Sequence, residues 1–397
     1  MIFQTLDNKG ECIGVFTNGE LLFEELPDGL THTWSYAPYL GKEVKYANLY
    51  CQGLSPDQVC PENLKGEWST ITKKMKAFLK SFSTSRVDLE EVCFFDLVPE
   101  RFLREYCDLK NRISQHVFEA YREPKNYDFL VALTEMVEEI ERNKLNLDFH
   151  GARNSLSCAA SVRSYKKIQR CLPRVKYNTF GTKTGRLSTK KNSFPILNLD
   201  RRYREVVKPT NDCFIELDFN AAELRTLLSL SGHDQPAGDL HEWNARNIYG
   251  GLVTREVAKK RIFSWLYNPN SHVQRAGQFY NRRKILTRYW DGEKVTTPFH
   301  REILADDAHA LNYLIQSTCS DMVLRQAIKV RNLLSGRKSK LIFIVHDSIV
   351  IDYSSEDKQM LDSLVSCFSE TELGKFRVGV QMGKDYGSMR DLKWTQS

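Results

Sequence analysis

The amino-acid sequence predicts an α+β protein with more than one domain. Its 397 residues exceed what a single hydrophobic core ordinarily supports, so two or three domains are expected. Short strand-like runs open the chain, long helical stretches fill its middle, and two further strand-like runs, 213–218 and 340–353, carry acidic residues. A hydrophobic fraction of 41% with 27% charged residues is typical of a globular protein and excludes a disordered chain.

The N-terminal region is expected to combine a small sheet with helices. Three strand-like runs separated by turn residues predict a β-meander: 2–6, 11–16 and 21–26. Amphipathic patterns predict helices over 68–83 and 98–125. The polar stretch 150–164 is the expected domain boundary.

Positive charge is concentrated in the second part of the chain. Residues 1–150 contain 17 Lys and Arg against 25 Asp and Glu, whereas residues 151–397 contain 40 against 25. Within 151–200, 11 basic residues accompany a single acid, Asp200. Such an imbalance needs a polyanion or neighbouring carboxylates to compensate it, so nucleic acid is the leading class of partner.

The cysteines and the chain start predict a reducing, cytoplasmic location. Ten cysteines are scattered without a CxxC pair, and the start MIFQTLDNKG lacks the pattern of a signal peptide. No run approaches the roughly 18 apolar residues of a membrane span, so no membrane partner is expected. No Cys or His pair has the short spacing of a structural zinc site.

The run CFIELD, 213–218, predicts a strand that places an acid at its end. Alternate residues of a strand share a face, so Phe214, Glu216 and Asp218 are expected on one side and the residues between them in a core. The following AAELRTLLSL is helical in pattern, which places Glu223 near Asp218. An acid that simply begins a turn is the alternative.

A second acid, Asp347, follows the apolar run IFIV and a histidine. Two carboxylates held at the ends of separate strands suit a pair of Mg²⁺ ions about 4 Å apart, as used in phosphoryl transfer. The alternative is a hairpin-turn aspartate beside a packed His346.

The segment 254–267 predicts a helix with one cationic and aromatic stripe. Arg255, Lys259, Phe263 and Tyr267 recur every four residues. The cations suit the phosphates of a nucleoside triphosphate, and the rings suit its sugar and base. A solvated helix face is the alternative.

Two further segments suit nucleic acid. Arg186 lies in the basic loop KTGRLSTKKN, 183–192, which is compatible with binding along a phosphate backbone. Asn312 and Gln316, in the helical run 311–323, are four residues apart and can donate to minor-groove acceptors. A plain basic loop and two exposed amides are the alternatives.

The order and spacing of these motifs resemble a known family. TGRLS, DFNAAELR, DLH, RxxxKxxxFxxxY, NxxxQ and HDS, in that order over 184–348, resemble the polymerase module of family A DNA polymerases, the DNA polymerase I-like enzymes, especially compact phage-type members. The resemblance covers about 175–390. The resemblance implies a right-hand fold. Its parts would be a palm at 177–238 and 312–397, fingers at 239–311, a reduced helical thumb at 101–176, and a small N-terminal α+β domain at 1–100.

The resemblance also implies a role for each motif residue. The catalytic carboxylates that bind two Mg²⁺ ions would be Asp218 and Asp347, with the carbonyl of Phe219. The nucleotide site would comprise Glu223 as a steric gate beneath the sugar 2′ position, with His241, Arg255, Lys259, Phe263 and Tyr267. The primer and template would contact Arg186, Asn312, Gln316 and His346. The implied reaction is attack of a primer 3′-oxygen on the α-phosphate of a dNTP.

The sequence departs from the family pattern at several positions. Ser348 replaces the acid that usually follows HD, and Ala221 occupies a usual Gln position. Four further departures lie near the nucleotide and template motifs: Ile262, Ser264, Asn268 and Ser317. Both metal-binding aspartates and both phosphate-binding cations are retained, so activity is expected.

The N-terminal region does not carry the acids of a proofreading exonuclease. The first strand, 2–6, lacks an Asp-x-Glu pair, and Asp88-Leu89-Glu90 is assigned to a helix start, where acids favour the helix dipole. Residues 1–100 are therefore expected to be a reduced exonuclease-like or docking domain without nuclease activity. A separate exonuclease or processivity subunit would then supply those functions.

Two alternatives remain at this stage. A single-subunit RNA polymerase would share the palm and the fingers helix, but Glu223 argues against it because a bulky gate excludes ribose. A non-catalytic primer-template-binding subunit is expected to lack a metal-binding aspartate, and both are present. If the protein is phage-encoded, its location is the cytoplasm of the bacterial host.

Overall fold

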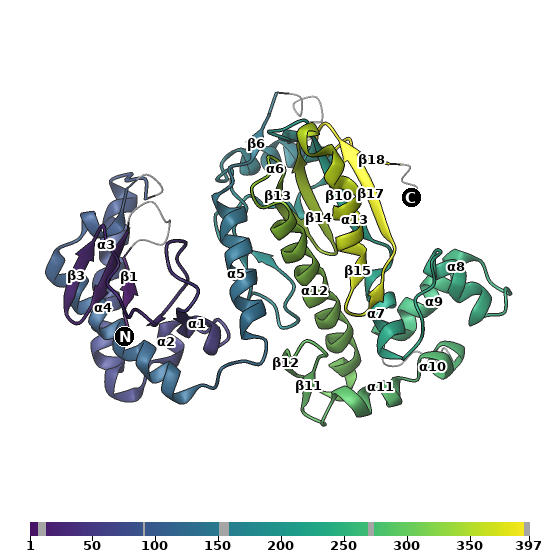
Figure 1. Cartoon of the computed structure of the whole chain (residues 1–397), viewed down its shortest axis with the longest axis horizontal. Coiled ribbons are helices and arrows are strands. Elements are labelled where there is room, and N and C mark those ends of the chain that lie inside the picture. Colours follow the sequence, from purple (N-terminus) through teal and green to yellow (C-terminus); the bar gives the residue numbers. More distant parts are fainter. Residues whose placement is uncertain (7–12, 90–91, 151–158, 269–273, 393–397) are drawn as a thin grey trace. The chain divides into compact units, whose positions relative to one another are not determined.

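Two separate hydrophobic cores divide the chain between Glu135 and Met136. The computed structural model describes residues 1–6, 13–89, 92–150, 159–268 and 274–392. Both the N-terminal unit (Met1–Glu135) and the C-terminal unit (Met136–Ser397) contain helices and strands, so the expected α+β class is confirmed (Figure 1). In the described part of the chain, no helix is both long and apolar enough to cross a bilayer.

The division between the units differs from the expected boundaries. The sequence predicts the domain boundary within 150–164, and residues 151–158 of that stretch fall outside the described residues. Helix α4 (Glu100–Ala120), assigned to a thumb, buries Phe102, Ile113 and Val117 in the core of the N-terminal unit. Its apolar stripe therefore belongs with the N-terminal unit, which extends to residue 135 rather than 100.

The N-terminal unit is built on a small antiparallel sheet. The strands β1 (Gln4–Thr5), β2 (Gly14–Thr17) and β3 (Glu20–Phe23) pair in the order β1-β2-β3, which confirms the β-meander. Its other elements are β4 (His32–Thr33), β5 (Lys45–Tyr46), α1 (Ala47–Tyr50), α2 (Pro56–Val59), α3 (Lys65–Thr84), α4, and the first part of α5 (Tyr127–Arg142). Helix α3 confirms the helix expected over 68–83, and α4 confirms the core of the one expected over 98–125.

The assignment of Asp88 to a helix start is wrong. Helix α3 ends at Thr84, Arg86 has a φ of 55°, and Asp88 and Leu89 lie in the connection that follows. The next helical turn begins at Phe94, too far along the chain for its dipole to favour Asp88. Glu90 falls outside the described residues.

A five-stranded antiparallel sheet forms the centre of the C-terminal unit. Its strands are β13 (Lys340–Val345), β14 (Ser348–Tyr353), β10 (Cys213–Phe219), β17 (Val378–Gly383) and β18 (Arg390–Asp391), in that order. Phe214 was expected on the same open face as Asp218, but it is 1% exposed, with its ring centroid 6.0 Å from that of Phe343. Only the far end of β10 therefore presents polar side chains.

Helix α12 (Asp307–Leu333) packs with α7 (Ala222–Leu230) and with α13 (Leu361–Ser369), and both α12 and α13 contact this sheet. The ring of Phe219 stacks on that of Phe368 from α13, with centroids 4.2 Å apart. The remaining elements of this unit are β6 (Asn146–Leu147), α6 (Ala159–Gln169), β7 (Tyr177–Asn178), β8 (Ser188–Thr189), β9 (Val207–Lys208), α8 (Leu240–Asn247), α9 (Arg255–Tyr267), α10 (Gln274–Tyr280), α11 (Arg282–Tyr289), β11 (Lys294–Thr296), β12 (Glu302–Leu304), β15 (Glu370–Thr371) and β16 (Gly374–Lys375).

Helices α8 to α11 share one apolar cluster with α7 and the first turns of α12. The cluster includes Leu227, Leu240, Ile262, Tyr280 and Leu314, each at most 1% exposed. In Figure 1 these helices, coloured teal to green, lie beyond the end of α7. Because α7 follows directly from β10, this packing fixes the helices next to the end of the strand that carries Asp218.

Candidate active site

The two aspartates singled out in the sequence lie at the same edge of the central sheet. The antiparallel register of β10 and β14 pairs Asp218 with Ser348, and Asp347 immediately precedes Ser348 in a two-residue turn. The N–H of Phe219 donates to the carbonyl oxygen of Asp347 at 3.4 Å. His346 adopts a φ of 56° to close the turn. The hairpin thus places both carboxylates side by side at a strand end.

The electrostatics of this edge favour a bound cation. Desolvation by the surrounding protein raises the pKa of Asp218 to about 7, and the charges of Asp347 and Glu216 contribute, although the Asp218 residue still reaches the surface. Burial also raises the pKa values of Asp347 and Glu216. The hydroxyl of Ser348 donates to Glu216 at 2.8 Å. Three acids therefore crowd one edge of the sheet.

The donor set fits Mg²⁺. Among the residues that the structure describes, no group of three or more His, Cys, Asp or Glu side chains forms a metal site. Two carboxylates and a backbone carbonyl nevertheless suit Mg²⁺, which usually keeps several waters and takes further oxygens from substrate phosphates. Asp218 and Asp347, with the carbonyl of Phe219, would hold such ions.

The raised pKa of Asp218 predicts that Mg²⁺ binding at this edge would depend on pH. A proton and the cation compete for one carboxylate, so the apparent Mg²⁺ affinity is expected to fall by up to roughly tenfold for each pH unit below about 7. Mg²⁺ titrations followed by thermal unfolding at pH 6 and pH 8 measure this. Asp218→Asn serves as the control and should reduce the pH dependence to the part that comes from Asp347. Equal affinity of the unaltered chain at both pH values would contradict the prediction.

A small pocket of about 110 Å³ is lined by Asp347. Its lining brings together four of the predicted site residues with Asp347: Arg186, Glu223, Phe263 and His346. Between β10 and α7, Ala221 adopts a φ of 53°, and this sharp turn brings Glu223 close to the strand end. Arg186 forms an ion pair with Glu223. Burial raises the pKa of Glu223, Asp347 raises it further, and Arg186 opposes the rise.

Helix α9 presents the predicted stripe away from its core. Thr254 caps the helix by accepting from the N–H of Val257 at 3.4 Å. The four stripe residues lie outside the buried side of the helix, which includes Ala258 and Ile262. The rings of Phe263 and Tyr267 stack with centroids 5.7 Å apart and planes at 6°. The stripe therefore lies on the accessible side of α9, and Phe263 within it lines the same pocket as Glu223.

Asp239 holds the start of the stripe in place. It caps α8 by accepting from the N–H of Glu242, and both of its oxygens accept from the guanidinium of Arg255, the shorter contact being 2.9 Å. Although burial opposes the shift, these hydrogen bonds lower the pKa of Asp239 to about 2. The DLH motif predicted a role for its histidine alone, so the role of Asp239 was not expected from the sequence. The position of Asp239 directly before a helical run was the available signal.

His241 lies inside this arrangement. Its ring is 5.9 Å from that of Phe263, the residue is 4% exposed, and its Nδ1 has no hydrogen-bond partner in the described structure. Burial lowers its pKa, with Lys259 and Arg255 contributing and Asp239 opposing. The imidazole is therefore expected to be neutral, and its Nδ1 can form a hydrogen bond with a ligand bound between α8 and α9.

Seven of the predicted site residues line neither pocket next to the aspartates: Phe219, His241, Arg255, Lys259, Tyr267, Asn312 and Gln316. Lys259 is exposed on α9, and Asn312 and Gln316 are partly buried on α12. The Oδ1 atom of Asn312 is buried without a hydrogen-bond partner among the described residues. Lys259, Asn312 and Gln316 therefore lie on α9 and α12 without lining a pocket described here.

The loop that carries Arg186 rests on a buried ion pair. Gly185 has a φ of 75°, and a Cβ atom there would lie 2.6 Å from the Cζ atom of Arg301. The guanidinium of Arg301 donates to both oxygens of Asp321, at 2.7 Å at the closest. The Asp321 side chain is 0% exposed. The loop that carries Arg186 therefore packs against the Arg301–Asp321 ion pair.

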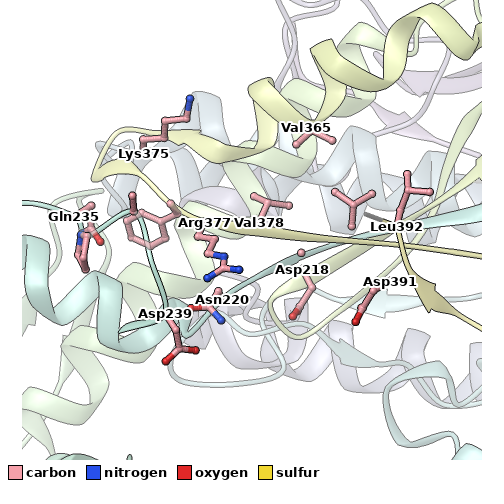
Figure 2. Close-up of a pocket in the computed structure, with 15 residues that line it drawn as sticks. Asp218, Asn220, Gln235, Asp239, Val365, Lys375, Arg377, Val378, Asp391 and Leu392 are labelled. Atoms are coloured by element: carbon pink, nitrogen blue, oxygen red, sulfur yellow. The ribbon is translucent and has the colours of Figure 1, made fainter. Parts of the chain in front are cut away.

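A larger pocket of about 780 Å³ lies on the other side of Asp218 (Figure 2). It extends from the end of β10 to the connection that contains Asp239, and β17 forms another wall. The pocket thus reaches from the metal-binding candidate Asp218 to Asp239, the ion-pair partner of Arg255.

Comparisons with known proteins bear on the fold. No family model matches this sequence, and no curated protein sequence matches it significantly. Among solved structures, the chain is similar to the POL domain of Pol1 from M. smegmatis, in complex with DNA primer-template and dNTP. The TM-score is 0.56 at 13% sequence identity, and the match covers 72% of this chain and 76% of that chain. The chain therefore has a right-hand polymerase fold within an α+β architecture.

Proposed function

We propose that this chain is a template-directed DNA polymerase that adds dNTPs to a primer 3′-OH in the presence of two Mg²⁺ ions. The observation that carries the proposal is the placement of Asp218 and Asp347 side by side, next to a pocket lined by Glu223 and Phe263. The similar solved domain is bound to primer-template DNA and dNTP, which supports the same class of ligand. The net positive charge of residues 151–397 fits a polyanionic partner.

Each part of the site has a task in this reaction. The bound Mg²⁺ ions would screen the charge that develops on the α-phosphate and activate the primer 3′-oxygen. Arg255, Lys259 and His241 would bind the triphosphate, and Phe263 would lie beneath the sugar and base. Arg186, fixed by Glu223, would orient the primer end near the aspartates.

We assign the parts of the right hand as follows. The central sheet with α7, α12 and α13 forms the palm, and α8 to α11 form the fingers. Because α4 belongs to the N-terminal unit, a thumb would be confined to residues between 136 and 176. We propose no nuclease activity for the N-terminal unit, since strands β1 and β2 contain no acidic residue.

Primer extension with the full chain tests the proposal. A labelled primer-template should be extended with Mg²⁺ and dNTPs, each step requiring the dNTP complementary to the template. NTPs should be used poorly, and a single-stranded primer without template should stay unchanged. Absence of extension, or extension that ignores the template, would overturn the proposal. Metal-dependent loss of 3′ nucleotides would contradict the absence of nuclease activity.

Glu223→Ala is expected to increase the use of NTPs relative to dNTPs by roughly tenfold or more, because it opens space beneath the sugar 2′ position. Single-nucleotide incorporation with dNTP and NTP measures the ratio. Glu223→Gln, which keeps the bulk of the side chain but weakens the Arg186 ion pair, is the matched control and should retain most discrimination against ribose. An unchanged ratio in Glu223→Ala would remove the argument against an RNA polymerase.

A further inference from the structure

Arg377 is an uncommitted cation beside the candidate metal site. In the register of β10 and β17, Asp218 pairs with Gly379, and the N–H of Asn220 donates to the carbonyl oxygen of Arg377 at 2.9 Å. Residues two apart on a strand share a face, so Arg377 faces the same side as Asp218. Arg377 is exposed, and it forms no ion pair in the part of the chain that the structure describes.

The acids near Arg377 are already engaged. Asp239 accepts two hydrogen bonds from Arg255, and Asp391 accepts one from Gln381 at 2.8 Å. Figure 2 shows Arg377 pointing towards the side of the pocket where Asn220, Asp239 and Asp218 lie, whereas Lys375 points to the opposite side. Arg377 is therefore the cation that a ligand next to Asp218 would meet.

A second, buried guanidinium lies behind the connection 235–238, which lines this pocket. Arg225 is 0% exposed and donates only to neutral oxygens: those of Asn220, Gln235, Pro236 and Gly238. These bonds also fix the connection 235–238 that lines the pocket. Burial and the charge of Arg377 lower the pKa of Arg225 to about 10, and Asp239 offsets only part of the effect. Together with Arg377, this guanidinium places two positive charges at a pocket lined by three carboxylates, those of Asp218, Asp239 and Asp391, so the anion that Arg377 would meet is one that arrives with a bound cation.

The position of the pocket identifies the anion. It reaches from Asp218 to Asp239, the partner of Arg255. A group that spans these points in the proposed reaction is the β,γ-phosphate part of the nucleotide, which leaves as pyrophosphate. We propose that Arg377 binds this group from the palm, opposite the cations of α9, both in the incoming dNTP and as released pyrophosphate. The inference rests on the proposed function, because it assigns a part of the same substrate.

Arg377→Ala is expected to raise the KM for dNTP and the inhibition constant of pyrophosphate by roughly tenfold, the effect of losing one charge-assisted hydrogen bond. The affinity for primer-template should be unchanged. Arg377→Lys should recover part of both losses, since it restores charge but not the planar guanidinium. Lys384→Ala is the matched control: it removes an exposed cation just beyond the end of the same strand and should alter neither constant.

Direct binding separates this inference from the proposed function. Calorimetric titration of pyrophosphate with Mg²⁺ into the full chain should show binding that weakens about tenfold in Arg377→Ala. Equal binding by both proteins, or none by the unaltered chain, would overturn the inference whether or not the chain extends primers. A weaker primer-template affinity with unchanged pyrophosphate binding would assign Arg377 to DNA phosphates and also overturn it. Failure of primer extension with intact pyrophosphate binding would count against the polymerase alone.

Discussion

Asp218→Ala and Asp347→Ala are each expected to lower the rate of primer extension by on the order of 10³-fold or more. Each removes one of the two carboxylates that the proposal assigns to the ions. The charge stabilisation that such ions supply is worth several kcal/mol, and about 1.4 kcal/mol corresponds to a factor of ten in rate. Single-turnover extension with saturating dNTP and Mg²⁺ measures the loss.

The loss should be confined to chemistry and metal binding. Both variants should fold, because the substitutions relieve crowding among acids at a surface edge. Their affinity for primer-template should stay within a few-fold of the unaltered chain in the absence of Mg²⁺. Asp362→Ala, an exposed acid in the first turn of α13, is the matched control and should extend primers normally. If either aspartate variant kept more than a tenth of the rate, its assignment as a metal ligand would be wrong.

The parts of the site that follow local rules could be predicted from the sequence. An apolar strand that ends in Asp218 and a hairpin that turns at Asp347 are visible as short patterns, and the four-residue spacing of the α9 stripe implies one helix face. These rules act within a few residues. Their outcome in the structure depends little on how the rest of the chain folds.

The parts set by long-range pairing could not be predicted. Arg377 reaches Asp218 only because β17 pairs with β10 in one register, across about 160 residues of intervening chain. No local pattern marks that register, and a shift of one residue would turn Arg377 to the other face. Long-range packing also sets the boundary between the N-terminal and C-terminal units. The apolar stripe of α4 has the same sequence pattern whichever core it packs into. Only the folded chain shows that it packs into the core of the N-terminal unit.

Arg301→Ala is expected to lower the free energy of unfolding of the C-terminal unit by about 3–5 kcal/mol. The variant leaves the carboxylate of Asp321 buried without its bidentate partner, and the side chain of Asp321 is 0% exposed. Chemical denaturation followed by circular dichroism measures the loss. Glu302→Ala is the matched control, because it breaks a partly exposed pair with Lys294 beside the same position. It should cost less than about 1 kcal/mol.

The double variant Arg301→Met with Asp321→Leu separates the fold from the site. Replacing both partners with apolar side chains removes the stranded charge, so its stability should return close to that of the unaltered chain. Primer extension should nevertheless remain impaired, because Gly185 packs on the guanidinium and the loop would lose the surface that positions Arg186 against Glu223. Full recovery of extension along with stability would show that the ion pair supports the fold alone. Recovery of stability without extension would place Arg301 among the residues that position the primer end.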